Sequence, residues 1–200
     1  MLELEKSLFN GLEDKRERIC KAAIKIFKEK NFNRTTVSEI AAKAHVGKGT
    51  FYLYFDSKIA LLDFLLEFGT EKLIEYVKNS IDENKSSRDK LEQVIDSQLE
   101  FFNFYQDFFS FFVREMWVHR EGLKEQVEKI NQEYIIIIND IIKEGIDDGS
   151  FKNLDSESLS SGLFGMLSIS SFHWIIFSGE FPYKKLKKDL TKVFLEGLLN

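Results

Sequence analysis

Cysteine, histidine and proline are all scarce in this 200-residue chain. The single cysteine, Cys20, has no partner for an internal disulfide, and the three histidines form no Cys/His cluster with the spacing of a structural zinc site. We therefore expect a cytoplasmic protein of a reducing compartment, with no metal and no other cofactor. The chain has 44% apolar and 30% charged residues, which is typical of a folded soluble protein rather than of a disordered or collagen-like one.

Motifs of catalysis are also missing. His45, His119 and His173 are far apart in the sequence, and neither H-E-x-x-H nor G-x-S-x-G occurs. Residues 1–10 contain charged side chains and no apolar run of the length found in a signal peptide. We expect a protein that is not an enzyme and that carries no targeting segment at its start.

One long uncharged stretch raises the question of a membrane. Residues 158–179 contain no Asp, Glu, Lys or Arg, but only about half of them are strongly apolar, and serines and three glycines interrupt the run. A spanning helix needs about 20 predominantly apolar residues. We expect no membrane span here, and instead a helix buried within, or between, soluble subunits.

Charge is distributed unevenly along the chain. Residues 15–58 hold eleven Lys and Arg against four Asp and Glu, a net of +7, whereas the whole chain carries −5, which leaves −12 on the remainder. Such asymmetry suggests a basic module that meets polyanions, attached to an acidic body that does not. The alternative is a solvated, lysine-rich helix face.

Helical periods run through almost the whole sequence, and no sustained period-2 alternation of the kind a sheet requires is found. The fold class is therefore all-α, with about nine helices. The first long helix is expected over about residues 13–30. One of its faces carries apolar residues at spacings of three and four, namely Ile19, Ala22, Ala23, Ile26 and Phe27.

Two short helices joined by a tight turn follow. Thr36-Val37-Ser38-Glu39 fits a capping box, so a helix should begin at Val37, and a second should follow through residues 48–55. With small alanines where the helices cross, and Val46 between them, this predicts a helix-turn-helix. A phosphate-binding loop at residues 47–50 is the rival interpretation, but the Walker spacing G-x-x-x-x-G-K-[ST] is absent.

At these residues the chain resembles the tetracycline-repressor (TetR) family of bacterial transcription regulators. The resemblance covers residues 15–62 at motif level, and the remainder only in length and helical plan. One departure is His45, which stands where the family usually has Gly in a left-handed turn; His is enriched there among non-glycine residues. The matching residues are Thr35 to Ala41, Ala44, Val46, Lys48-Gly49-Thr50, Tyr52, Tyr54-Phe55, Ser57-Lys58 and Leu61-Leu62.

The resemblance implies a DNA-binding domain over residues 1–57 whose second short helix, about 48–54, enters the major groove. Lys48 and Thr50 are then expected to reach bases, and Gly49 to let the backbone approach the DNA. Tyr52 and Tyr54 correspond to contacts with phosphates or thymine methyl groups. Phosphates are also expected at Thr36 and Lys58; the alternatives are that Thr36 only caps its helix and that Lys58 is only solvated.

Residues 58–200 are then expected to form a helical bundle for ligand binding and dimerisation. Residues 98–117 are rich in phenylalanine, and because no single helix face can hold so many rings, we predict a break around residues 105–107. Aromatic rings at helical spacing are more often core than ligand site, but the family holds its inducer pocket here, and such pockets are apolar with a few polar groups. The candidates are Gln98, Phe102, Tyr105, Phe109, Phe112, Arg114, Trp117, His119 and His173.

The residue patterns of the last three helices are typical of helices packed in a core or an interface. The four consecutive isoleucines Ile135 to Ile138 predict burial on nearly all sides. The final two helices, about 156–178 and 183–199, combine apolar and small residues, and Pro182 should open the last one. The resemblance implies that they form a homodimer interface, although the same features would also suit a closed monomeric core.

The sequence thus predicts a homodimeric repressor, released from a palindromic double-stranded DNA operator by a hydrophobic small molecule, such as a long-chain acyl compound or an aromatic drug. A small-molecule or lipid-binding protein of the same fold without a DNA role is one alternative. A regulator without an inducer is another.

Overall fold

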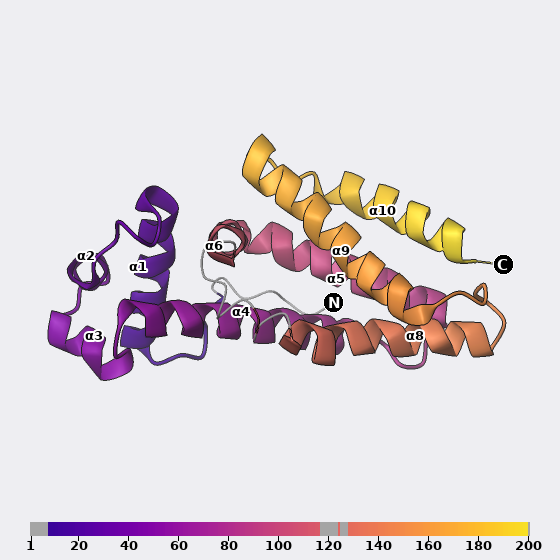
Figure 1. Ribbon diagram of the computed structural model, residues 1–200, viewed down its shortest axis with the longest axis horizontal. Coiled ribbons are helices and arrows are strands. Elements are labelled where there is room, and N and C mark those ends of the chain that lie inside the picture. Colours follow the sequence, from indigo (N-terminus) through magenta and orange to yellow (C-terminus); the bar gives the residue numbers. More distant parts are fainter. Residues whose placement is uncertain (1–7, 117–123, 125–127, 200) are drawn as a thin grey trace. The chain divides into compact units, whose positions relative to one another are not determined.

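The computed structural model describes residues 8–116, 124 and 128–199, and these form nine α-helices and two π-helical segments. Within these ranges extended pairing is limited to one isolated bridge between Phe151 and Leu199, so the all-α prediction is confirmed. The elements are α1 Asp14–Lys30, α2 Val37–Lys43, α3 Lys48–Tyr54, α4 Lys58–Ser80, α5 Ser87–Phe104, α6 Gln106–Met116, η1 Ile130–Ile135, α8 Ile136–Asp147, α9 Ser156–His173, η2 Trp174–Ser178 and α10 Tyr183–Leu198 (Figure 1).

The helices fall into two compact units. Among the described residues, we call 8–71, 105–116 and 124 the head, and 72–104 and 128–199 the body. The packing divides the chain inside α4 and places α6 in the head, and the boundary at residue 57 stays a prediction. Helix α6 belongs to the head because it covers α1, so the side chains of the two helices are buried together.

Aromatic rings fill the core of the head between α1, α4 and α6. Phe27 of α1 stacks on Phe111 of α6 with ring centroids 5.2 Å apart. The Phe108 ring of α6 lies against Gly69 of α4, where an added Cβ would come within 2.1 Å of the ring. Glycine is therefore needed at residue 69 for close contact between α4 and α6.

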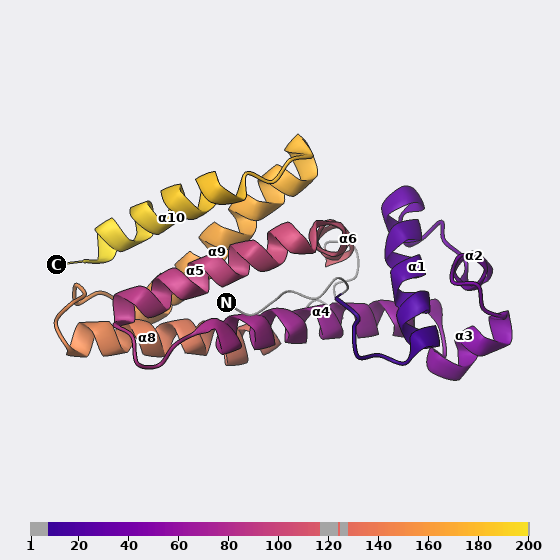
Figure 2. The ribbon, with the colours of Figure 1, turned by 180° about the vertical axis from the view of Figure 1, so that it is seen from behind.

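In the body, α5 packs against α8, α9 and α10 (Figure 2). Its Lys90 is buried, and the ammonium contacts Glu144 of α8 at 2.9 Å and Glu83 at 3.2 Å. A second glycine that lies directly against a phenylalanine ring is found here, because an added Cβ at Gly145 would come within 2.2 Å of the buried Phe151 ring. The Asp155 side chain caps α9, since its carboxylate accepts from the Ser158 amide at 2.8 Å.

Several predictions about local structure can be checked against these helices. The predicted break is confirmed, because α5 ends at Phe104 and α6 begins at Gln106. The prediction for the four isoleucines was wrong: Ile138 is buried, but Ile136 is 49% exposed. Four successive positions point around a whole helix, and only one side of α8 faces α5 and α9. Pro182 lies at the N-cap of α10, just before the helix.

Candidate nucleic-acid interface and the polar core of the body

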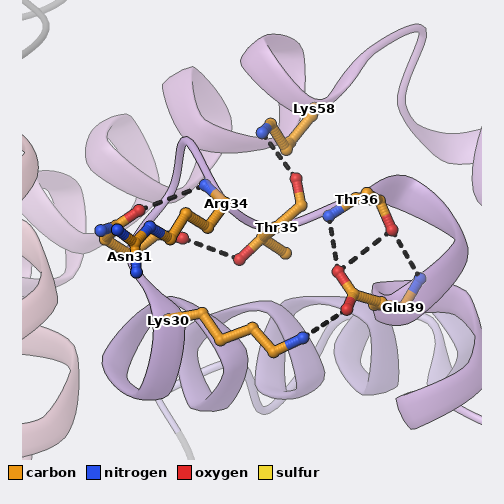
Figure 3. Close-up of polar contacts among 7 residues, drawn as sticks. All are labelled: Lys30, Asn31, Arg34, Thr35, Thr36, Glu39 and Lys58. Atoms are coloured by element: carbon orange, nitrogen blue, oxygen red, sulfur yellow. Dashed lines mark hydrogen bonds and ion pairs between the residues drawn. The ribbon is translucent and has the colours of Figure 1, made fainter.

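The helix-turn-helix begins at a complete capping box (Figure 3). The Glu39 amide donates to the Thr36 hydroxyl at 3.3 Å, and the Thr36 amide donates to the Glu39 carboxylate at 2.9 Å. Lys30, at the end of α1, pairs with the same carboxylate. This Lys30 bond, followed by those from Thr36, lowers the pKa of Glu39 to about 2. The start of α2 is thus fixed by residues of α1 and of its own first turn.

The turn between the two short helices has the predicted left-handed residue. His45 has a φ of 54°, and the amide of Val46 closes the turn by donating to the Ala41 carbonyl at 3.0 Å. Asn31, the residue after α1, also has a positive φ, of 66°, but its ψ of 165° lies outside the left-handed helical region. It still closes the helix, because its amide donates to the Phe27 carbonyl.

The third helix, α3, presents one side to the core and the other to solvent. Phe51 is fully buried, whereas Lys48, Gly49 and Tyr52 are exposed and Thr50 is partly covered. Space around Gly49 is open, since an added Cβ would have no neighbour within 4 Å. Among the described residues, no hydrogen bond or ion pair engages Lys48. The predicted base-contacting residues therefore lie on the solvent side of α3.

Lys58, which the sequence predicts to contact phosphate, has hydrogen-bond partners within the head. Its ammonium donates to the Thr35 carbonyl at 2.6 Å (Figure 3). It also donates to the Phe32 carbonyl at 2.7 Å and lies 4.2 Å from the centre of the Phe32 ring. A cation with these partners ties the α1–α2 connection to the start of α4. This geometry favours a structural role for Lys58, because a phosphate would have to compete with two carbonyls already in place.

Of the three remaining residues predicted to contact phosphate, Thr36 and Tyr54 have hydrogen-bond partners inside the head. Thr36 uses its hydroxyl in the capping box. The Tyr54 hydroxyl donates to the carboxylate of Glu13, and this bond raises the pKa of Tyr54. Tyr52 has its ring edge-on to Phe51 and is exposed. Of the aromatic pair, Tyr52 is thus the one that faces solvent.

The predicted ligand residues are divided between the two units. Gln98 and Phe102 are buried in the body, whereas Phe109 and Phe112 are buried in the head, and Tyr105 is half-buried there. The exposed ring of His173 contacts Trp174 and Phe177, so in this structure it does not line the interior of the body. Trp117, His119 and the side chain of Arg114 lie outside the described residues.

Gln98 is at the centre of a buried hydrogen-bond network. Tyr134 of η1 donates to its carbonyl oxygen at 2.6 Å, and its amide donates to the Ser168 hydroxyl at 3.1 Å. All three side chains are buried and come from three helical elements. Burial raises the pKa of Tyr134, so the phenol stays protonated and donates at any pH that the fold survives.

Comparison with known proteins identifies the chain. Residues 19–64 match the family described as bacterial regulatory proteins, tetR family, and residues 84–198 match the tetracyclin repressor-like C-terminal domain. The chain belongs to the TetR family. The helix-turn-helix of this TetR-family regulator is therefore a DNA-binding element of a transcription regulator, as its residues predicted.

Three relatives match this TetR-family chain over most of its length. The fatty acid metabolism regulator protein of Bacillus subtilis (strain 168) is 25% identical over 183 residues, 91% of this chain and 94% of that protein. A Clostridium perfringens structure, named as a candidate fatty acid metabolism regulator, is 30% identical, with a TM-score of 0.79 and coverage of 92% and 99%. The regulator FadR of Bacillus subtilis, solved in complex with stearoyl-CoA, is 25% identical, with a TM-score of 0.77 and coverage of 90% and 97%.

Two features of the TetR-family chain were not found from its sequence. The first is Leu53 on α3, which is 82% exposed. Its position one turn after Gly49 could have indicated that it lies on the same side of the helix. Tyr134 and Ser168 join Gln98 across gaps of 36 and 70 residues, for which one sequence carries no signal. By length and composition alone, one of the described helices, residues 156–178, could cross a membrane: an 18-residue stretch of it has a mean hydropathy of 1.3 and is 28% buried.

Proposed function

We propose that this chain is a homodimeric repressor whose two α3 helices bind a palindromic operator, and whose release from DNA follows the binding of a long-chain acyl-CoA. The observation that carries the DNA part is the complete helix-turn-helix with Lys48 and Gly49 on its solvent side. Likeness to a regulator that binds stearoyl-CoA, over 90% of this chain, supports the ligand class.

Lys48, Thr50 and Tyr52 are proposed to make the direct DNA contacts, because they line the solvent side of α3. Gly49 allows the helix backbone to approach the groove. The roles of Thr36, Tyr54 and Lys58 are indirect: their side chains fix α2 and the starts of α1 and α4 around α3. Contacts that hold the reading helix in place contribute to affinity without touching a base.

The DNA part is tested by fluorescence anisotropy with the duplex upstream of the chain's own gene and a scrambled duplex, at several salt concentrations. Lys48→Ala should abolish the preference for the upstream duplex. Lys143→Ala removes the same charge from an exposed position in the body and should leave the preference unchanged. Salt must be varied because neutralised phosphates make affinity salt-dependent. Equal binding of both duplexes by the wild type would favour a ligand-binding protein without a DNA role.

The ligand part is tested on the same complex by adding stearoyl-CoA, with free coenzyme A and a short acyl-CoA as controls. A ligand shifts the equilibrium only by its differential affinity for the DNA-bound and released states. Coupling of this kind typically changes affinity about 5- to 150-fold. An operator affinity unchanged by saturating stearoyl-CoA would contradict this ligand class, and would favour a regulator without an inducer of this kind.

The dimer is proposed to form through α9 and α10. Ile169 of α9 and Val193 of α10 are more than 60% exposed, and added Cβ atoms at Gly162 and Gly165 would meet nothing within 4 Å. A second copy would cover these surfaces, and the small residues would allow close approach of the helices. Sedimentation equilibrium should show a dimer for the wild type and for Leu154→Glu, and a monomer for Ile169→Glu. Binding of the wild type to phosphatidylglycerol vesicles would instead favour a membrane role for residues 156–178.

A further inference from the structure

The middle of the solvent side of α3 carries no polar side chain. Successive residues of a helix are about 100° apart, so residues four apart lie on one line. Gly49 and Leu53 form such a line, directly opposite the buried Phe51. Lys48 and Tyr52 flank this line on one side, and Thr50 flanks it on the other.

The surroundings of Leu53 show no packing role for its side chain. Its side chain is 82% exposed, the largest value among the large apolar residues of the described chain. Scattered exposed leucines are common on protein surfaces and usually mean nothing. Here, however, the leucine lies in the middle of the solvent side of the helix that we propose to bind DNA, one turn after a glycine with open space around it.

The major groove offers one apolar group among the base edges, the C5 methyl group of thymine. We propose that Leu53 is a specificity-determining residue that packs on thymine methyl groups in the operator, while Lys48 and Thr50 make polar contacts at its flanks. This inference rests on the proposed DNA-binding function and deepens it, because it names the chemical group that the centre of α3 reads.

Uracil provides the sharpest probe, since it differs from thymine only by the missing methyl group and pairs in the same way. Duplexes bound by the wild type are first recovered from a random 30-base-pair pool. Each thymine of the recovered site is then replaced by uracil, symmetrically in both half-sites, and dissociation constants are measured by anisotropy at one salt concentration. Wild type, Leu53→Ala and the matched Leu154→Ala, an exposed leucine of the body, are compared.

Burial of one methyl-sized group is worth about 0.8 kcal/mol, or about fourfold in affinity. For two half-sites, uracil at the contacted position should weaken wild-type binding about 15-fold, and Leu154→Ala should behave in the same way. Leu53→Ala should bind the thymine and uracil duplexes equally. Its thermal unfolding should match that of the wild type, because an exposed side chain adds little to stability.

The outcomes separate this inference from the function on which it rests. If uracil weakens DNA binding by Leu53→Ala as much as by the wild type, or weakens binding by neither protein at any position, the assignment of Leu53 is wrong. Sequence-specific binding still stands in that case. If no duplex is enriched by the wild type, the proposed function fails and the assignment fails with it. Loss of DNA binding by Leu53→Ala with an unchanged ratio between the two duplexes would likewise overturn it.

Discussion

In the head, the residues that interact lie close together in the sequence, whereas in the body they lie far apart. In the head, the capping box joins Thr36 to Glu39, the turn closes between Ala41 and Val46, and the solvent side of α3 lies within seven residues. In the body, Gln98 is bonded to Tyr134 and Ser168, from other helices. A local motif can be recognised in one sequence, whereas a site assembled from distant helices needs the fold.

Each unit also contains one place where a phenylalanine ring occupies the space beside a glycine. In the head it is Phe108 against Gly69, and in the body it is Phe151 against Gly145. Both rings are buried, so neither can move aside without loss of packing. Equivalent substitutions at these two glycines can therefore perturb the stability of the head and of the body separately.

The largest effects are expected from alanine at these two glycines. An added Cβ would lie 2.1 Å from the Phe108 ring at residue 69 and 2.2 Å from the Phe151 ring at residue 145. Overpacking of this kind costs about 1–3 kcal/mol. Chemical denaturation of Gly69→Ala and Gly145→Ala should show a lower free energy of unfolding, partly restored by Phe108→Leu and Phe151→Leu respectively.

The control for both is Gly49→Ala, measured without DNA, because a Cβ at residue 49 would meet nothing within 4 Å. Alanine is also favoured over glycine in a helix, by about 1 kcal/mol. This variant should therefore be as stable as the wild type or more so. If Gly69→Ala were as stable as Gly49→Ala, the packing of α6 on α4 within the head would be in question.

A smaller effect is expected from Tyr134→Phe in the body. The change removes the donor to the Gln98 carbonyl and leaves that oxygen buried without it, which costs about 1–3 kcal/mol. Tyr76→Phe is the matched control: the Tyr76 hydroxyl donates to Glu100 at 2.6 Å, but this tyrosine is only half-buried, so water can replace the bond. Unfolding in urea should separate the two variants, and equal losses would mean that water reaches Gln98.

The same contrast explains what the sequence could and could not predict. The Thr36 cap, the start of α2 at Val37 and the break after Phe104 depend on neighbouring residues, and each was predicted. Lys58 was predicted to contact phosphate, and its bonds to Phe32 and Thr35 could not be predicted because they reach back more than twenty residues. Phe102 and Phe109 were both predicted to be ligand residues, and a sequence of rings does not show that the first lies in the body and the second in the head.

The smallest effect should come from the pH dependence of the two helix caps. In the head, the pKa of Glu39 is lowered to about 2, chiefly by Lys30 and then by Thr36. In the body, the pKa of Asp155 is lowered by its bonds from Ser158. A carboxylate whose pKa is lower in the folded state adds stability above its unfolded pKa, about 4, and this stability is lost as the pH falls towards the folded pKa.

Glu39→Gln and Asp155→Asn keep the hydrogen-bonding shape of each cap and remove its titration. Between about pH 5 and pH 2 the melting temperature of each variant should therefore fall less steeply than that of the wild type. Both carboxylates face solvent, so screening keeps the differences small. Glu39→Gln should show the larger change, because it also loses the ion pair with Lys30. If its acid unfolding curve is parallel to that of the wild type, the link from α1 to the start of α2 is not made by this carboxylate in solution.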